Sequence, residues 1–238
     1  MSLSTAMSLA HILDSSNWIA PPDISGPDVH SRATVDLASF EGPLPAVASS
    51  MAPRRMRELA AGRRCAAQAL RDAGSPELEV GVGAHREPRW PAGFVGSITH
   101  SASFAWAAVA RAARVRALGI DSEPVFDEAA MLEAAPLALT PEEYEECSAM
   151  GGPHARERAT LVFSAKESLY KCLYPLVGTF VDCLEARVIS PSSDGAGCGT
   201  FSVRLLRDLA PGFGRHTRFE GRFVMARGHV HTAIEVRP

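Results

Sequence analysis

The sequence lacks the features that mark secreted, membrane-spanning or nucleic-acid-binding proteins. Its five cysteines contain no Cys-x-x-Cys pair, and an odd number cannot pair fully within one chain. No apolar run approaches bilayer length, and residues 1–11 have neither the basic lead nor the continuous apolar core of a signal peptide. A formal net charge of -3 gives no overall attraction to nucleic acid or to an anionic membrane. We therefore expect a cytoplasmic protein with reduced thiols, which binds neither nucleic acid nor a membrane.

The composition is that of an ordinary globular protein. Of 238 residues, 46% are hydrophobic and 21% are charged, which suits one large domain or two small ones with a sizeable core. Residues 15–50 are rich in Pro, Ser, Asp and Gly and predict an irregular segment, with a short strand at 33–37. Regular structure is therefore expected to begin after residue 50.

The middle of the chain predicts a helix followed by two strands. Apolar residues recur at helical spacing over 54–73, and Gly74 stands where such a helix would end. Residues 94–98 and 104–110 are strand-like, and the polar residues 99–103 between them predict a loop that carries His100.

The second half of the chain repeats this order of elements. A short apolar run over 115–120 places Asp121 at or just past a strand end, where open α/β sheets commonly place their chemistry. Two helical pieces over 127–150, the second capped at Thr140, precede a helix over 154–173 that Pro175 is expected to end. Four further strands are expected, over 186–189, 200–206, 219–226 and 230–236.

These elements predict an α+β fold, in the broad sense of mixed α/β, made of two similar halves. We place the halves at residues 1–117 and 118–238, although no sequence repeat relates them. A cleft between two such halves is the expected place for a ligand.

Three carboxylates and two lysines form the most suggestive polar group. Asp121 and Glu123 are two residues apart, so in an extended segment both point to one side and could reach one cation. Glu167 and Lys171 are four apart on the expected helix, and Lys166 precedes them. Taken singly, the first pair is typical of a solvated strand end and the second of a surface helix ion pair. Their apolar neighbours favour a functional site instead.

Four motifs, in this order, resemble the surfactin-type 4′-phosphopantetheinyl transferases, and most of all their enterobactin-synthetase component D branch. They are Gly-Ile-Asp-Ser-Glu at 119–123, Phe-Ser-Ala-Lys-Glu-Ser-Leu-Tyr-Lys at 163–171, the run from Trp-Pro to Thr-His-Ser at 90–101, and the arginine-rich helix at 54–70. The resemblance implies two halves in a pseudo-twofold arrangement with the active site in the cleft between them. It also implies transfer of the phosphopantetheine arm of coenzyme A to a serine of an apo acyl or peptidyl carrier protein, with release of 3′,5′-ADP.

The resemblance assigns a metal site and a candidate base. Asp121, Glu123 and Glu167 would hold Mg²⁺, with Mn²⁺ as the alternative, because hard cations take oxygen ligands. Lys166 and Lys171 would add positive charge near the phosphates. A carrier serine needs a base within reach, and Glu167 is the candidate. A water-mediated base, or Lys171 as the proton carrier, stays open.

The resemblance also implies residues that bind coenzyme A. Arg55 and Arg63 match the positions that bind its 3′-phosphate end, for which the planar guanidinium is suited. His100 would face a phosphate, with Thr99 beside it. A lysine or arginine usually stands where this chain has His85, so Arg86 is the expected substitute.

Two other functions remain open at this stage. One is a protein that binds coenzyme A or a nucleotide without transferring anything, and the other is a different metal-dependent phosphoryl transferase or hydrolase. The first would require a missing ligand, yet all three carboxylates are present. Because one chain carries both halves, we expect a monomer, which would serve carriers of polyketide, nonribosomal peptide or fatty-acid synthesis.

Overall fold

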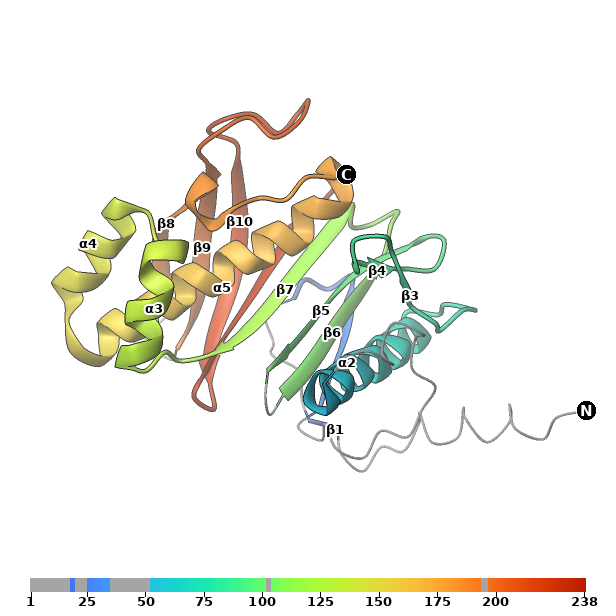
Figure 1. Cartoon of the computed structure of the whole chain (residues 1–238). Coiled ribbons are helices and arrows are strands. Elements are labelled where there is room, and N and C mark those ends of the chain that lie inside the picture. The colour runs from blue at the N-terminus through green and yellow to red at the C-terminus, as the bar shows by residue number, and fades with distance from the viewer. Residues whose placement is uncertain (1–17, 20–24, 35–51, 102–103, 194–196) are drawn as a thin grey trace, which may run out of the picture. The chain divides into compact units, whose positions relative to one another are not determined.

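The computed structural model describes residues 18–19, 25–34, 52–101, 104–193 and 197–238 (Figure 1). Contacts divide the chain into two compact units at residues 115 and 116. The first unit holds β1 (Trp18–Ile19) and the described residues between Pro27 and Val115. The second holds residues 25–26 and the described residues from Arg116 on. The mixed α+β class predicted from the sequence is confirmed.

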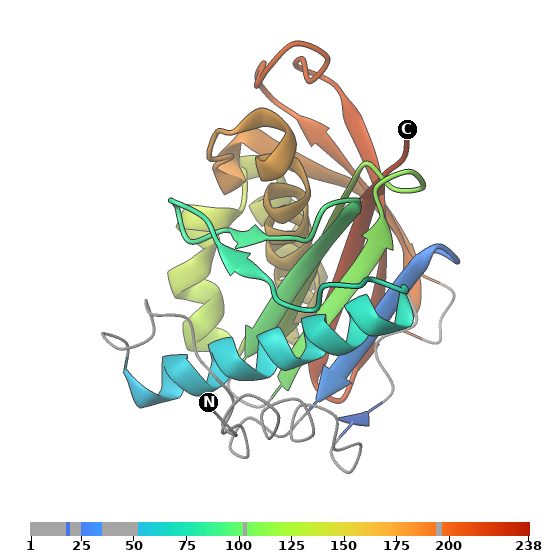
Figure 2. The same ribbon diagram turned by 90° about the vertical axis from the view of Figure 1, so that its right-hand side faces the viewer.

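In the first unit, one helix covers one antiparallel sheet. The sheet has the order β1-β2-β6-β5, and α2 lies across one of its faces (Figure 2). The last strand in sequence, β6, therefore pairs with the strand that precedes the helix, β2. The principal elements are β2 (Val29–Thr34), α2 (Pro53–Asp72), β5 (Phe94–Ser101) and β6 (Phe104–Arg111). A separate short hairpin joins β3 (Gly81–Val82) to β4 (Pro88–Arg89).

The predicted helix of the first unit is confirmed, and its glycine has a structural reason. Pro53 occupies the first turn of α2, where its missing N–H costs no hydrogen bond. A Cβ atom added at Gly62 would lie 2.7 Å from Cγ2 of Ile98 on β5. Gly62 therefore allows the helix to lie close to the sheet, at a cost of about 1 kcal/mol in helix propensity. The core beneath it includes Ala61, Cys65, Ala66, Ala69, Leu70, Ala105, Ala107 and Val109.

The second unit uses the same connectivity on a larger sheet. Its strands have the antiparallel order β7-β11-β10-β9-β8, so the last strand, β11, again pairs with the strand that precedes the helices, β7. The long helix α5 (Gly152–Val177) covers one face. The strands are β7 (Ala117–Pro124), β8 (Ala186–Ser193), β9 (Cys198–Leu205), β10 (Arg218–Ala226) and β11 (His229–Val236).

A glycine again permits the closest approach of helix and sheet. A Cβ atom at Gly119 on β7 would overlap the carbonyl oxygen of Ser168 and lie 2.7 Å from the backbone N of Cys172, both on α5. Backbone atoms cannot move aside as a side chain can, so any larger residue would push the helix away from β7. The core below α5 includes Val162, Ala165, Leu169, Leu173, Phe201, Val203 and Ile234.

Two shorter helices connect β7 to α5, as the sequence predicts. The Asp127 carboxylate accepts a hydrogen bond from Ala130 N at the start of α3 (Glu128–Ala138). Thr140 and Glu143 form a capping box at the start of α4 (Pro141–Met150). These polar residues satisfy N–H groups that have no partner within the first turn of a helix.

Three predicted boundaries are wrong. Residues 99–101 belong to β5, so His100 lies in a strand opposite Ala105 and not in a loop. Asp121 and Glu123 lie within β7, which pairs with β11 as far as Pro124. In both places the strand continues through polar side chains, because a strand carries polar and apolar residues on alternate faces.

The third error concerns the end of the long helix. Pro175 lies within the last turn of α5, which ends at Gly178 in a left-handed conformation with φ 65°. Near a C-terminus proline removes only one backbone hydrogen bond, so it does not stop the helix there. In the strand predicted at 33–37, only residues 33–34 are described, and they form the end of β2.

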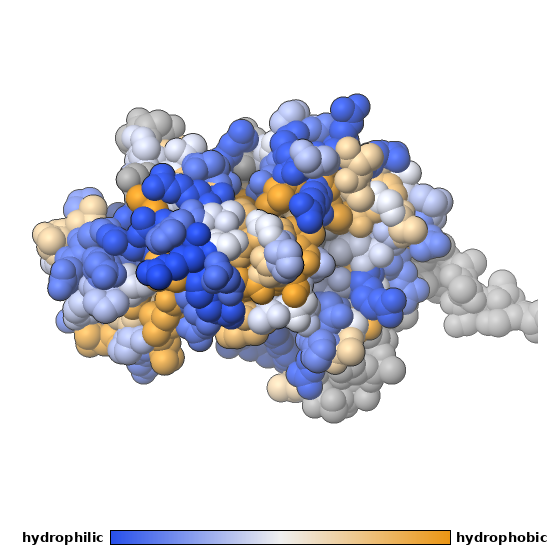
Figure 3. Space-filling model, turned by 90° about the horizontal axis from the view of Figure 1, so that it is seen from above, coloured by the Kyte–Doolittle hydropathy of each residue, from blue (hydrophilic) through white to orange (hydrophobic). Residues whose placement is uncertain are grey.

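Among the described residues, no helix is long and apolar enough to cross a membrane. The surface in Figure 3 carries hydrophobic areas that hydrophilic residues interrupt. The exposed large hydrophobic side chains are Leu132, Leu137, Tyr144, Met150, Phe180 and Leu184.

Candidate active site

The face of β7 that α5 covers carries the predicted carboxylates. Asp121 bonds to Lys171 on α5, and Glu123 lies two residues further along β7, on the same face. Thr232, opposite Asp121 on β11, also bonds to α5, which fixes the direction of this face. The structure thus brings residues about 50 positions apart in sequence to one helix–sheet contact.

Lys171 neutralises Asp121. Its Nζ donates to Oδ1 of Asp121 at 2.6 Å, and the Asp121 side chain is only 2% exposed. Burial lowers the pKa of Lys171, but Asp121, Glu167 and Glu123 outweigh that effect and hold the pKa above its ordinary value. Lys171 is therefore a cation at neutral pH.

The two glutamates near this lysine hold their protons more tightly than ordinary carboxyl groups. Burial, with the repulsion of Asp121 and Glu167, raises the pKa of Glu123 to about 8, although Lys171 acts in the opposite direction. Burial also raises the pKa of Glu167, which Lys171 lowers and Asp121 raises. The three carboxylates and Lys171 therefore act as one electrostatic group.

The donor set suits a hard divalent cation, since it consists of carboxylate oxygens and a bound cation would relieve their repulsion. Within the described ranges, however, no three His, Cys, Asp or Glu side chains are grouped so that they could hold one ion. The ligand roles of Asp121, Glu123 and Glu167 stay a prediction that the chemistry of the group supports.

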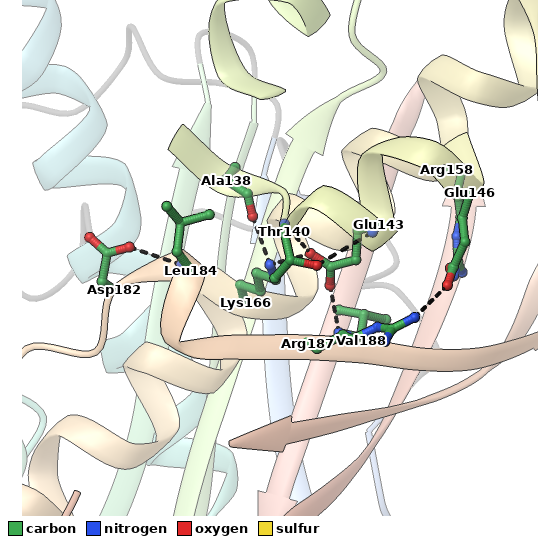
Figure 4. A network of polar contacts seen from close by, with 10 residues as sticks. All are labelled: Ala138, Thr140, Glu143, Glu146, Arg158, Lys166, Asp182, Leu184, Arg187 and Val188. Atoms are coloured by element: carbon green, nitrogen blue, oxygen red, sulfur yellow. Dashed lines mark hydrogen bonds and ion pairs between the residues drawn. The ribbon is translucent and has the colours of Figure 1, made fainter. Parts of the chain in front are cut away.

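Lys166 lies in a different environment from Lys171, and Figure 4 shows the contacts of Lys166. Its side chain is 1% exposed, and its Nζ donates to Oε2 of Glu143 at 2.5 Å and to the carbonyl oxygen of Ala138 at 2.7 Å. Glu143 also accepts hydrogen bonds from the backbone N atoms of Thr140 and Val188. Lys166 thus joins α3 and α4 to α5, and these contacts give no support to its predicted role at the phosphates.

On the opposite face of this sheet, β11 carries two histidines, of which His231 is buried. Nδ1 of His231 lies 2.8 Å from Oγ of Ser122, the residue between the two carboxylates. The His231 ring stacks on that of His229 with centroids 5.9 Å apart. Burial, and the neighbouring His229, lower the pKa of His231 to about 4, so the imidazole is neutral at neutral pH. The His231 side chain is thus enclosed, and the residue is only 4% exposed.

In the first unit, a buried carboxylate connects the predicted phosphate-binding residues. Glu58 on α2 is 6% exposed. Its carboxylate contacts Arg54 at 3.0 Å, Arg55 at 3.4 Å and Nδ1 of His100 at 3.7 Å. The structure therefore brings Arg55 and His100 together on the side of β5 that faces α2, with Glu58 between them. Sequence analysis missed Glu58, although its spacing of three and four from the arginines was a signal.

Arg63 lies two turns further along α2 and is more enclosed than Arg55. Its Nη1 donates to the carbonyl oxygen of Gly81 at 3.0 Å. Burial lowers its pKa, which Glu79 raises in part. A contact with the backbone of β3 holds this guanidinium in place while leaving its other N–H groups for a ligand.

Thr99 and Arg86 do not join this group. Thr99 is 3% exposed, and strand alternation turns it to the face of β5 opposite His100. Arg86 is exposed in the turn between β3 and β4, with φ 69°. Their proposed contacts with coenzyme A remain predictions, and Thr99 would have to act from the other side of the strand.

Two family models together match most of the chain. The model described as the 4′-phosphopantetheinyl transferase N-terminal domain matches residues 44–110, and that of the 4′-phosphopantetheinyl transferase superfamily matches residues 117–226. The second match covers β7, α5 and the carboxylates just described.

Curated relatives agree with the family models. The chain is 41% identical to the 4′-phosphopantetheinyl transferase Svp of Streptomyces mobaraensis, over 77% of this chain and 73% of Svp. It is 35% identical to PptT of Mycobacterium tuberculosis, over 80% of this chain and 82% of PptT. Enterobactin synthase component D of Escherichia coli is 37% identical over 50% of this chain and 54% of its own length. With the two family models, these similarities show that the chain belongs to the 4′-phosphopantetheinyl transferase superfamily.

Proposed function

We propose that this protein transfers the 4′-phosphopantetheine arm of coenzyme A to a serine of apo acyl or peptidyl carrier proteins and releases 3′,5′-ADP. The observation that carries the proposal is that Lys171 of α5 bonds to Asp121 of β7, near enough to Glu123 and Glu167 for both to raise its pKa, in a chain of this superfamily. A group of three carboxylates and one protonated lysine suits phosphoryl chemistry, in which positioning and charge compensation dominate.

Asp121, Glu123 and Glu167 would hold Mg²⁺, with Mn²⁺ as the alternative. The ion, when bound, would neutralise charge on the pyrophosphate of coenzyme A. Burial, with the repulsion of Asp121 and Glu167, raises the pKa of Glu123 to about 8, and a bound divalent cation would relieve that repulsion, which supports this assignment.

Glu167 is the proposed base for the carrier serine. Its raised pKa makes it a better proton acceptor than an ordinary carboxylate once it is ionised. Lys171 is held protonated by Asp121 and the two glutamates, so it is suited to bind phosphate oxygens and not to accept the serine proton. The proton would thus pass from the serine hydroxyl to a carboxylate oxygen of Glu167 as the serine attacks the β-phosphorus.

Residues of the first unit would bind coenzyme A. We assign Arg55, Arg63 and His100 to its phosphates, with Arg86 and Thr99 as further contacts. Glu58 supports the assignment of Arg55 and His100, because its carboxylate holds both groups on the same side of β5. Phosphate binding there would require Arg55 to exchange part of its contact with Glu58 for the ligand.

The protein is further proposed to be a cytoplasmic monomer that modifies carriers of polyketide, nonribosomal peptide or fatty-acid synthesis. All five cysteines are free, as expected in a reducing compartment. Both family models match this single chain, which supports a site assembled without a second copy. The exposed Leu132 and Leu137 of α3, and Tyr144 and Met150 of α4, offer apolar surface to a partner protein.

Intact-mass analysis of apo carriers tests the proposal. The protein is mixed with coenzyme A, Mg²⁺ and one apo carrier each from fatty-acid, polyketide and nonribosomal peptide synthesis. The expected result is a mass increase equal to the phosphopantetheine arm on at least one carrier, and its loss when EDTA replaces Mg²⁺. Unchanged masses for all three carriers would refute transfer, and coenzyme A binding measured by calorimetry would then favour a binding protein without transferase activity.

A further inference from the structure

Three buried hydroxyl groups connect α5 to the sheet beside the candidate active site. Oγ1 of Thr232 on β11 lies 2.9 Å from Oγ of Ser164 and 2.6 Å from Oγ of Ser168. All three residues are fully buried. Serine within a helix commonly bonds to the carbonyl oxygen one turn earlier, whereas here both side chains reach across to one residue of the sheet.

The geometry determines which groups donate. Oγ1 of Thr232 lies 2.9 Å from the backbone oxygen of Ser164 and donates its single hydrogen there. Its two lone pairs are then available to Ser164 and Ser168, whose hydroxyls donate to it. Every member of the cluster is thereby satisfied. Replacing the threonine by valine would leave the buried hydroxyl of Ser164 without this acceptor, a change that costs more than the loss of one hydrogen bond in water. The hydroxyl of Ser168, in contrast, keeps the carbonyl oxygen of residue 232 at 3.3 Å.

The cluster lies next to the candidate active-site residues, on the same helix and on the strand that pairs with β7. Thr232 pairs directly with Asp121 in the β7–β11 ladder. Ser168 follows Glu167 immediately and precedes Lys171 by about one turn of α5. A slide of α5 along the sheet would therefore move Glu167 and Lys171 relative to Asp121, and the cluster opposes that slide. Gly119 fixes only the depth of the contact, because it allows close approach without any directional bond.

We propose that Thr232 is a positioning residue for the transfer reaction, and that its hydrogen bonds with Ser164 and Ser168 hold α5 in the register that pairs Lys171 with Asp121. The proposal rests on the proposed function for its effect on turnover. Its structural part, the coupling of Thr232 to the Lys171–Asp121 pair, stands independently of any activity.

The first experiment measures that coupling without activity. Double-mutant cycles in urea unfolding compare the interaction of Asp121 with Lys171, from Asp121→Asn and Lys171→Met, in the native background and in Thr232→Val. We expect the interaction to fall by at least half in Thr232→Val and to be retained in Thr232→Ser. Thr34→Val is the control, because Thr34 is a fully buried threonine of the first unit. An unchanged interaction in Thr232→Val would overturn the proposal.

The second experiment measures turnover. Thr232→Val should lower kcat for carrier modification by roughly 10- to 100-fold at a temperature where the variant is fully folded, since small displacements of reacting groups have effects of this size. KM for coenzyme A should change less than kcat, and Thr232→Ser should restore most of the rate. A variant that loses melting temperature but keeps kcat would show a merely structural role.

Two arms keep the outcomes distinct. If Thr232→Val does not fold, Ser168→Ala replaces it in both experiments, because it removes one donor while leaving the threonine in place. If no carrier is modified by the native protein, the proposed function fails while the unfolding cycle still decides the role of Thr232. Loss of the coupling with unchanged kcat would refute the positioning role in catalysis.

Discussion

The two units use the same connectivity to present opposite charges. In each, a strand precedes the long helix that covers an antiparallel sheet. The last strand in sequence then pairs with the strand that precedes the helix. In the first unit the helix and β5 present Arg55, Arg63 and His100, and Glu58 contacts Arg55 and His100. In the second, β7 and α5 present three carboxylates around Lys171.

The way each helix approaches its sheet also differs. In the first unit the glycine that permits close contact is Gly62, on the helix, whereas in the second it is Gly119, on the strand. The second arrangement leaves the full length of α5 for side chains such as Ser164, Ser168 and Lys171, which bond to the sheet. The same connectivity can thus present basic side chains in one unit and carboxylates in the other.

The largest expected effect tests whether the chemistry belongs to the second unit. Glu167→Gln should lower the rate of transfer roughly 100- to 10,000-fold, because it removes the proposed base and one negative charge of the metal site. The rate is measured by intact-mass analysis of the carrier, and circular dichroism checks the fold. Glu157→Gln, a partly exposed position on the same helix, should keep the native rate. Full turnover in Glu167→Gln would mean that both its metal and base roles are misassigned.

The next largest effect concerns stability and separates the two lysines of the second unit. Lys166→Met should lower the free energy of unfolding by about 3–5 kcal/mol, since it leaves the buried Glu143 carboxylate without its cation. Arg187→Met, which breaks the more exposed pair with Glu146, should cost about 1 kcal/mol or less. Both are measured by urea unfolding. Equal losses for the two variants would contradict the structural role assigned to Lys166.

The first unit should respond in binding and not in turnover. Arg63→Ala should raise KM for coenzyme A about tenfold or more, because a charged hydrogen bond to phosphate contributes about 1.5–3 kcal/mol. The rate constant kcat should stay near the native value. Arg57→Ala, an exposed arginine of the same helix, is the matched control. A variant with native KM and reduced kcat would contradict the assignment of coenzyme A binding to the first unit and of the chemical step to the second.

The last expected effect is the pH dependence of stability when no metal is bound to the second unit. The pKa of Glu123 is about 8 in the folded protein against an ordinary 4.5, so the folded state holds its proton while the unfolded chain has lost it. Stability should therefore fall as pH rises from about 4.5 to about 8.

Glu123→Gln tests this directly. In EDTA the variant should lose less stability than the native protein over that pH interval, because it has no carboxyl group at this position to ionise. Urea unfolding at both ends of the interval gives the measurement, with the exposed Glu220→Gln as control. Equal pH dependence of native protein and Glu123→Gln would show that the pKa of Glu123 is not raised in the folded protein.

Sequence reasoning was most reliable where local chemistry decides the structure. The periodicity of residues 54–73 predicts α2, and Thr140 with Glu143 predicts the start of α4. It failed at residues 99–101 and at Pro175, where strand pairing and the position within the last helical turn override local preference. It missed Glu58 and Thr232 because their partners lie on other elements and only folding brings them into contact.

The amino-acid sequence alone is enough to recognise the family, the α+β class and the ionisable residues that the proposed chemistry needs. The contacts that each of those residues makes are visible only in the tertiary structure. Lys166 and Lys171 are equivalent as letters in one motif, yet the first lies buried against Glu143 and the second against Asp121. The reason is geometric: five residues along a helix point in different directions, so each side chain takes its charge partner from a different neighbouring element.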